Sequence, residues 1–312
     1  MSEPKVSLIT VNYNQADITC ALLESIRQQD YRNVEVIVVD NASRENPAAL
    51  FREQFPEAVF LRSERNLGFA GGNNLALPHA TGDFLFFVNN DAELTDGAIR
   101  RLLDIFEAHP KAGIVSPLIC YMPEDHAGPD VIQYAGMTPI HPLTGRNRTI
   151  GHKVPDRGQF SQPGQTAYAH GAAMMVPRQV LEQVGPMSED FFLYYEELDW
   201  CERIRRAGWQ VWVQPLARVY HKESLTVNKM GTLKTYYLTR NRVRFMHRHF
   251  SPLQRIGFQA FWWLVTVPKN VLLYAVRGEW ANLRAFLRGA TDSESASMLT
   301  NGGLALSHSG VK

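Results

Sequence analysis

The amino-terminal part of the sequence alternates between apolar runs and one amphipathic run, and this alternation constrains the fold most strongly. The runs KVSLITVNYN and VEVIVVDNAS are rich in β-branched residues, which favours strands. Between them, DITCALLESIRQQD repeats Ile18, Leu22 and Ile26 every four residues, as one face of a helix does. This order predicts a βαβ unit and a parallel sheet that is covered on both faces.

Further elements extend this pattern and end in polar residues. FLFFVNND is another apolar run, and AIRRLLDIFEAHP predicts a helix that ends before Pro110. Ligands of such sheets bind beyond the carboxyl ends of the strands, and this is where the sequence places Asn12, Asp40 and Asp91. Each of these residues, taken alone, is equally typical of a turn or a helix cap.

The composition is that of a globular protein, with 312 residues of which 45% are hydrophobic, enough for one large domain or two small ones. Cys20, Cys120 and Cys201 lack the spacing of a disulfide framework or a zinc site and fit a reducing compartment. The N-terminus resembles no signal peptide, so secretion is not expected. Between Cys120 and Thr166 the periodicity is lost, which predicts a functional loop region. Residues 291–312 are rich in Ser and Gly and predict a flexible tail.

The charge of the chain is distributed unevenly. The formal net charge is +1, yet residues 229–290 contain eleven Lys and Arg against one acid, Glu279, together with three tryptophans. A bilayer span needs about 20 apolar residues, but Pro268 and two polar residues interrupt residues 257–276. We therefore expect this segment to lie at a membrane interface without crossing it. A solvated helical extension or a homodimer surface is the alternative.

The stretch FFLYYEELDW places Glu196, Glu197 and Asp199 against five aromatic side chains. Burial of an unpaired carboxylate costs several kcal/mol, so such a cluster is solvated, paired, or kept for its perturbed ionisation. On a helix that begins near Glu196, Glu197 shares the inward face with Cys201, while Glu196 and Asp199 lie nearer Arg203. Aromatic neighbours raise the pKa of a carboxylate by desolvation, which suits a general base.

Six motifs occur together and in a recognisable order between about Val6 and Ser224. They are VNYN, VVDNAS, NLGFAGGNN, VNNDAE, GAAMMVPRQVLEQVGPMSEDFFLYYEELDWCERIRRAGW and VYHKES. This order resembles the inverting family 2 glycosyltransferases with the GT-A fold, especially bacterial rhamnosyltransferases. The resemblance implies an α/β fold with a central, mostly parallel sheet flanked by helices. We expect a catalytic domain at 1–225, a basic aromatic helical extension at 226–290 and the tail at 291–312.

The resemblance also implies roles for individual residues. Glu197 stands where the family usually has an Asp as general base, in an acidic group that includes Glu196 and Asp199. Asp91 and His221 would hold Mg²⁺ or Mn²⁺. Asp91 ends the family's Asp-x-Asp motif, whose first residue is Asn89 here, a departure that weakens metal affinity or shifts Asn89 to ribose binding. The implied donor-nucleotide residues are Thr10, Asn12, Asp40, Asn66, Gly68, Asn74, Asn89 and Asn90, and those near the sugar are His170 and Gly171.

The implied chemistry is inverting sugar transfer. A divalent ion neutralises the departing nucleotide diphosphate, and Glu197 removes the proton of an acceptor hydroxyl. The implied donor is dTDP-rhamnose and the acceptor a glycan or polyprenyl-linked sugar of cell-surface polysaccharide synthesis. A UDP-hexose or galactofuranose transferase is the alternative. The enzyme would be cytoplasmic and peripheral on the inner face of the plasma membrane, where the basic segment meets anionic lipid.

Three rival classes account less well for these motifs. A non-catalytic nucleotide-sugar-binding scaffold would have little need for Asp91, the acidic group and His221 together. The basic segment could bind nucleic acid through phosphates, but no nucleic-acid motif accompanies it. A sugar-phosphate nucleotidyltransferase would carry a Gly-rich basic loop after the first strand, and VNYNQAD contains neither Gly nor Lys. We therefore expect a glycosyltransferase without a nucleic-acid partner.

Overall fold

The computed structural model describes residues 3–123, 128–222 and 231–295, which form two compact units. Unit 1 comprises residues 1–141 with 146–229, and unit 2 comprises residues 142–145 with 230–312. The predicted boundary near residue 225, the last two residues of the VYHKES motif and most of the predicted tail lie outside the described residues.

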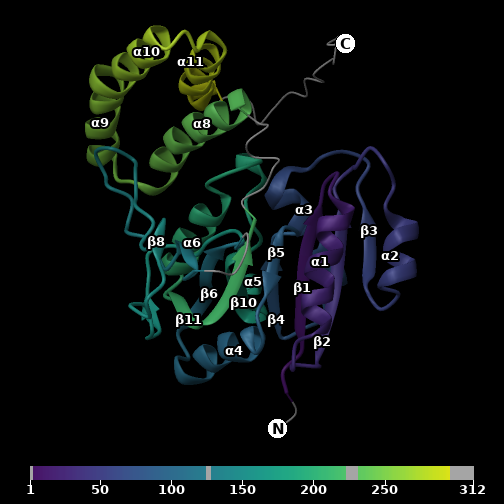
Figure 1. The fold of residues 1–312 in the computed structure, drawn as a ribbon. Helices are drawn as coiled ribbons and strands as arrows, with labels where there is room; N and C mark the ends of the chain where they lie inside the picture. Colours follow the sequence, from purple (N-terminus) through teal and green to yellow (C-terminus); the bar gives the residue numbers. More distant parts are fainter. Residues whose placement is uncertain (1–2, 124–127, 223–230, 296–312) are drawn as a thin grey trace. The chain divides into compact units, whose positions relative to one another are not determined.

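Unit 1 is built on one mixed sheet, whose strands have the order β3-β2-β1-β4-β10-β6-β11-β5 (Figure 1). β1, β2, β3 and β4 are mutually parallel neighbours, as predicted for the amino-terminal part, whereas β10 is antiparallel to both β4 and β6. The strands are β1 (Val6–Asn12), β2 (Val34–Asp40), β3 (Val59–Arg62), β4 (Phe84–Val88), β5 (Ala92–Leu94), β6 (Ala112–Tyr121), β7 (Val131–Tyr134), β8 (Val154–Pro155), β9 (Gly164–Gln165), β10 (Ala173–Pro177) and β11 (Gln210–His221).

Helices cover both faces of this sheet. α1 and α4 pack on one face, and α3 and α6 pack on the other. The predicted helices over DITCALLESIR and AIRRLLDIFEA are confirmed as α1 and α4. The helices of unit 1 are α1 (Ala16–Arg27), α2 (Ala48–Gln54), α3 (Gly68–Ala76), α4 (Ala98–Ala108), α5 (Arg178–Val184) and α6 (Glu196–Arg206), with short 3-10 turns η1 (Leu77–His79) and η2 (Glu189–Phe191).

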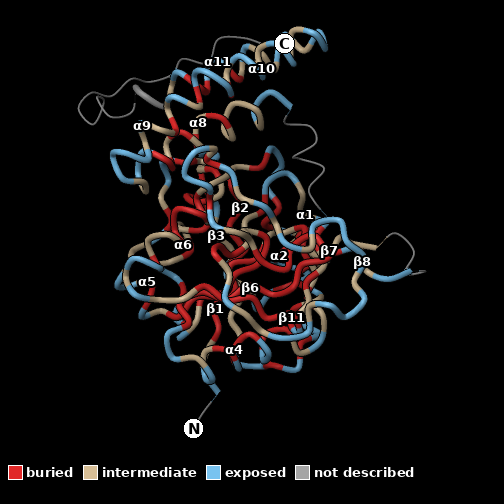
Figure 2. The backbone as a smooth tube through the Cα atoms, turned by 90° about the vertical axis from the view of Figure 1, so that its left-hand side faces the viewer, coloured by how far each residue is buried: buried red, intermediate tan, exposed pale blue. Residues whose placement is uncertain are grey.

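The core follows from the alternation of side chains along the strands. Leu8 of β1 and Phe86 of β4 pack against Leu22 of α1, whereas Phe87 meets Trp200 of α6 on the other face, with ring centroids 5.4 Å apart. Figure 2 shows buried residues along the strands, including β1 and β6. The sheet is thus a rigid support that fixes the positions of the residues at its strand ends.

The region expected to be a long loop contains short strands. β6 continues to Tyr121, and β7 pairs antiparallel with it, although the register shifts between Ile119 and Cys120. β7 has four residues, and β8 and β9 have two each. None of these three strands is long enough to produce a recognisable period in the sequence. Residues 124–127 lie outside the described part.

Residues 231–295 of unit 2 form helices joined by short connections. They are α8 (Gly231–His249), α9 (Pro252–Phe261), the π-helical segment η3 (Trp262–Thr266), α10 (Val267–Val276) and α11 (Trp280–Ser295). Within residues 231–295, none of these helices is long and apolar enough to cross a membrane. α11 extends into the range predicted as tail, because Tyr236 donates a hydrogen bond to Asp292 at 2.7 Å and holds this turn.

Candidate active site

Four polar residues lie at the carboxyl ends of strands in the sheet, and these ends are on the same side because the strands run in the same direction. Asn12 ends β1 and pairs in register with Asp40, which ends β2. β10 is antiparallel to β4 and to β6, and β11 is parallel to β6, so β4 and β11 also end on this side. Asp91 follows β4, and His221 ends β11 directly opposite Ala92. The structure places Asn12, Asp40 and Asp91 at the carboxyl ends of their strands, as predicted, while their part in ligand binding stays a prediction.

Asp40 is fully buried and held by a polar network. Its Oδ1 atom accepts hydrogen bonds from Asn12 at 2.8 Å and from the Ser43 hydroxyl at 2.5 Å. Its Oδ2 atom lies 3.0 Å from the guanidinium of Arg62. The Thr19 hydroxyl donates to Asn12 Oδ1 at 2.9 Å and fixes the amide from the other side. The carboxylate is thus oriented by neighbours before any ligand arrives.

Two further residues predicted to bind the nucleotide lie beside this network. The Asn90 amide donates to the Thr19 hydroxyl at 3.1 Å, which links the end of β4 to the end of β1. The Thr10 hydroxyl is buried and has no hydrogen-bond partner among the described residues. A buried hydroxyl without a partner costs free energy, so Thr10 is a candidate to contact a bound ligand.

Asp91 and His221 form the second part of the site. Nε2 of His221 lies 3.1 Å from Oδ1 of Asp91 and 3.3 Å from the side-chain nitrogen of Asn89. Nδ1 of His221 lies 2.8 Å from the side-chain oxygen of Gln133 on β7. Asp91, His221 and Gln133 are all buried.

This pair has the chemistry of a partial cation site. Imidazole nitrogen and carboxylate oxygen are ligands for Mn²⁺ and related ions, and adjacent ligands of an octahedral ion with bonds of about 2.1 Å lie about 3 Å apart. The described residues contain no group of three or more His, Cys, Asp and Glu that could hold an ion by itself. Two protein ligands fit an ion whose other positions are taken by phosphate oxygens and water.

The acidic stretch has a strained backbone immediately before its carboxylates. Phe192, Tyr194 and Tyr195 have φ values of 64°, 68° and 76°, which bulky residues rarely adopt. α6 then begins at Glu196, with Glu197 in its first turn. Backbone strain of this kind persists where surrounding structure enforces it and is common at functional sites.

The two glutamates share a poorly solvated environment. Burial raises the pKa of Glu197 to about 7, and Glu197 itself is only partly exposed. Burial, and then the charge of Glu197, raise the pKa of Glu196 well above its ordinary value. Glu196 Oε2 is buried without a hydrogen-bond partner among the described residues. Burial therefore favours the protonated form of both carboxyl groups, and the neighbouring charge of Glu197 adds to this effect at Glu196.

Asp199 has a different environment from the two glutamates. It is fully buried and pairs with Arg203 one helical turn later, at 2.9 Å. Arg203 also donates to the backbone oxygens of Val184 and Pro186. This ion pair ties α6 to the segment after α5, so the geometry supports a structural part for Asp199.

His170 and Gly171 lie on the segment that connects Glu197 to the Asp91–His221 pair. A methyl group added at Gly171 would lie 3.9 Å from the carboxyl carbon of Glu197. The next residue, Ala172, accepts a hydrogen bond through its backbone oxygen from the backbone nitrogen of Asn89 at 2.9 Å. The rings of His170 and His221 are 6.2 Å apart, and burial lowers the pKa of His170 to about 3.

The NLGFAGGNN segment, which includes the start of α3, packs against the acidic stretch. Gly68 has a φ of 73°, and a side chain there would meet the backbone oxygen of Phe192 at 2.2 Å. Asn66 accepts hydrogen bonds from Asn41 at 3.1 Å and from the Gly68 backbone at 2.9 Å. The Asn74 amide donates to the Met187 backbone oxygen at 2.9 Å. All three residues make contacts within the protein, which explain their presence without a ligand. Their contact with a nucleotide stays a prediction.

Sequence reasoning missed several residues of this site. Ser43 stands three residues after Asp40, a spacing that Asp-centred turns share and that could have been noticed. Thr19 and Arg62 have no such local signal, because they reach the network from α1 and from the end of β3. Gln133 lies in the region predicted as loop, 88 residues from its partner His221.

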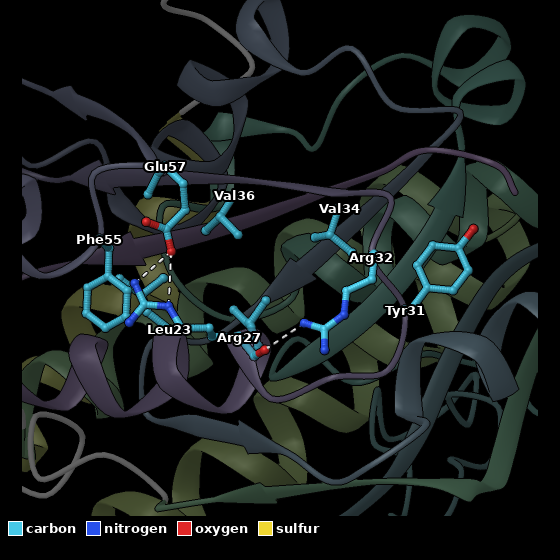
Figure 3. Close-up of a pocket in the computed structure, with 10 residues that line it drawn as sticks. Leu23, Arg27, Tyr31, Arg32, Val34, Val36, Phe55 and Glu57 are labelled. Atoms are coloured by element: carbon cyan, nitrogen blue, oxygen red, sulfur yellow. Dashed lines mark hydrogen bonds and ion pairs between the residues drawn. The ribbon is translucent and has the colours of Figure 1, made fainter.

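A separate hollow lies between α1 and the start of β2 (Figure 3). It is lined by Leu23, Val36 and Phe55, and also by Arg27 and Glu57, which form an ion pair at 2.7 Å. Val34 and Val36 belong to the amino-terminal half of β2, whereas Asp40 is at its carboxyl end. The hollow therefore lies at the other end of the strand from Asp40. It does not include any of the predicted site residues.

Comparison with known proteins gives consistent results. The family model described as Glycosyl transferase family 2 matches residues 7–185, a range that includes Asn12, Asp40, Asp91 and Gly171 and ends before the acidic stretch. The hexosyltransferase Agl10 of low-salt glycan biosynthesis from Haloferax volcanii is 27% identical over 253 residues, which are 79% of this chain and 76% of that protein.

Two further similarities concern sequence and fold. N-acetylglucosaminyl-diphospho-decaprenol L-rhamnosyltransferase from Mycobacterium tuberculosis is 24% identical over 234 residues, 70% of this chain and 76% of that protein. The mannosyltransferase PcManGT from Pyrobaculum calidifontis, solved with GDP-Man and Mn²⁺, has a TM-score of 0.57 at 18% identity and covers 96% of this chain and 89% of its own. The structural similarity confirms the predicted fold class.

Proposed function

The chain belongs to glycosyl transferase family 2, and from this premise we propose that it transfers a hexosyl group, with inversion, from a nucleotide diphosphate to an acceptor hydroxyl. One observation carries the proposal. The carboxyl carbon of Glu197 would lie 3.9 Å from a methyl group at Gly171, and Ala172 is hydrogen-bonded to Asn89 beside His221. The segment 170–172 therefore lies between Glu197, the proposed proton acceptor, and Asp91 with His221, the proposed cation ligands.

The residues at the strand ends would bind the donor. Asp40, oriented by Asn12 and Arg62, can accept hydrogen bonds from N–H groups of a nucleotide base. Asp91 and His221 would hold Mg²⁺ or Mn²⁺, and such an ion supplies charge neutralisation for the departing diphosphate. Mn²⁺ is present in the structure of the mannosyltransferase with the same fold, which supports this assignment.

Glu197 is the group we assign as general base. A pKa of about 7 matches the pH at which it would accept a proton from a hydroxyl and release it afterwards. Attack by that hydroxyl on the face opposite the diphosphate produces inversion. Glu196, whose pKa is raised well above its ordinary value by burial and by the charge of Glu197, can in its protonated form donate a hydrogen bond to Glu197 or to the acceptor.

For the donor sugar, we favour rhamnose from a dTDP donor. The support is the sequence similarity to the mycobacterial rhamnosyltransferase and the motif order. A UDP-hexose or galactofuranose donor is the alternative, and a second relative is a hexosyltransferase. Residues 229–290 would bring the enzyme to a membrane that presents a lipid-linked acceptor, since they combine strong positive charge with exposed apolar side chains.

A thermal-shift screen tests the donor assignment. The purified protein is heated with dTDP, UDP or GDP, each with Mg²⁺, Mn²⁺ or EDTA, and a ligand that binds the native state raises the melting temperature. We expect the largest shift with dTDP and a divalent ion. A larger shift with UDP would favour the alternative donors. Failure of the protein to transfer or hydrolyse any sugar nucleotide would favour a non-catalytic scaffold.

A further inference from the structure

Gln133 is a buried polar residue in an otherwise apolar strand. Its neighbours on β7, Ile132 and Tyr134, are fully buried, and Gln133 is 5% exposed. A buried amide is costly unless it is hydrogen-bonded. The bond that its oxygen makes is to Nδ1 of His221 at 2.8 Å.

This bond determines which ring nitrogen of His221 carries the proton. An amide oxygen only accepts hydrogen bonds, so Nδ1 must carry a hydrogen atom. On the other side of the ring, the side-chain nitrogen of Asn89 lies 3.3 Å from Nε2. An amide nitrogen only donates, so Nε2 must present a lone pair. Both contacts fit the same tautomer.

The lone pair of Nε2 is then directed at a carboxylate. Oδ1 of Asp91 lies 3.1 Å from Nε2, so the imidazole nitrogen and the carboxylate oxygen face each other at the carboxyl end of the sheet. A divalent cation bound by both atoms makes this arrangement favourable. Metal-binding histidines commonly donate their other ring N–H to an oxygen acceptor, which fixes the tautomer and ring orientation.

We propose that Gln133 is a positioning residue, which holds His221 in the Nδ1–H tautomer and aims Nε2 at the cation site shared with Asp91. The inference rests on the proposed metal-dependent function. It gives the irregular region between β6 and β10 a role, because β7 brings the Gln133 oxygen to His221 at the end of β11.

Two substitutions at this position separate positioning from packing. Gln133→Met keeps an unbranched side chain of similar length and removes the acceptor, whereas Gln133→Glu keeps an oxygen acceptor. The matched control is Gln214→Met on β11, where another buried glutamine donates to the Arg101 backbone oxygen at 3.1 Å. Mn²⁺ affinity is measured in the presence of dTDP by titration calorimetry, and the tautomer of His221 by ¹⁵N NMR of histidine-labelled full-length protein.

We expect Gln133→Met to weaken Mn²⁺ binding by about 10- to 100-fold and to reduce the population of the Nδ1–H tautomer. Gln133→Glu and Gln214→Met should bind Mn²⁺ as the unchanged protein does. An Nε2–H tautomer in the unchanged protein, or equal Mn²⁺ affinity in Gln133→Met, would overturn this inference alone. Absence of Mn²⁺ binding by the unchanged protein would overturn the proposed metal dependence and this inference with it. The NMR measurement on the unchanged protein decides even if Gln133→Met does not fold.

Discussion

At the scale of single residues, Glu197 carries the strongest prediction. Glu197→Gln keeps the shape of the side chain but removes its ability to accept a proton, so we expect transfer to fall by at least about 10²-fold. Nucleotide binding, measured by calorimetry with dTDP and Mn²⁺, should stay close to that of the unchanged protein. Substantial remaining turnover would assign the base to Glu196 or Asp199 instead.

Gly171→Ala tests the space beside the base. The added methyl group would lie 3.7 Å from Phe69 and 3.9 Å from the Glu197 carboxyl carbon, an ordinary contact that requires no backbone change. It occupies room that a reacting sugar needs, so we expect kcat/KM to fall by about tenfold or more at unchanged melting temperature. Unchanged kcat/KM would mean that neither substrate enters this space.

The raised pKa values of the two glutamates predict opposite effects of pH on activity and stability. The proposed base role requires Glu197 in its ionised form, so kcat/KM should rise as the pH passes through about 7. The folded protein binds more protons than the unfolded chain between the ordinary glutamate pKa of 4.5 and about 7, so the free energy of unfolding should decrease as pH rises through this window. Glu196→Gln should make that decrease smaller in urea unfolding at pH 5 and pH 8. An equal decrease in the variant would contradict a buried, protonated Glu196.

At the scale of elements, the ends of β4 and β11 act together. Asp91→Asn and His221→Ala should each reduce the stabilisation that Mn²⁺ gives to the protein in the presence of a nucleoside diphosphate, because we propose that both residues bind the same cation. Melting temperatures with Mn²⁺ or EDTA report the difference. If diphosphate binding is indifferent to EDTA and to both substitutions, the metal assignment is wrong.

The same elements indicate how far the sequence alone can lead. β1, α1, β2 and α4 were predictable because their periods are local, and Asp40 and Asp91 were predictable because they follow apolar strands. The neighbours that orient these carboxylates come from elsewhere in the chain. Arg62 reaches Asp40 from β3, and Gln133 reaches His221 from a four-residue strand. Pairings over such sequence separations leave no periodic signal.

At the scale of the whole molecule, apolar exposure is concentrated in unit 2. Leu264, Leu272 and Val276 are 78%, 65% and 77% exposed, whereas the largest value among the large hydrophobic residues that the structure describes in unit 1 is 54% at Leu216. The same unit carries most of the eleven Lys and Arg of residues 229–290. Exposed aliphatic and tryptophan side chains among cationic ones are typical of a surface that binds anionic lipid.

This surface predicts reversible membrane binding. Each cation near anionic lipid contributes roughly 1 kcal/mol, an attraction that salt screens, and apolar burial adds about 25 cal/mol per Å². Full-length protein should therefore sediment with anionic liposomes at low salt and less so at high salt or with neutral liposomes. The triple variant Leu264→Gln, Leu272→Gln and Val276→Gln, which keeps every charge, should sediment less at all salt concentrations.

Full-length protein that stays in the supernatant at low salt, as a chain ending near Ser224 should, would instead support a solvated extension. Concentration-dependent self-association that the triple variant abolishes, without lipid binding, would identify the surface as a contact between two copies of the chain.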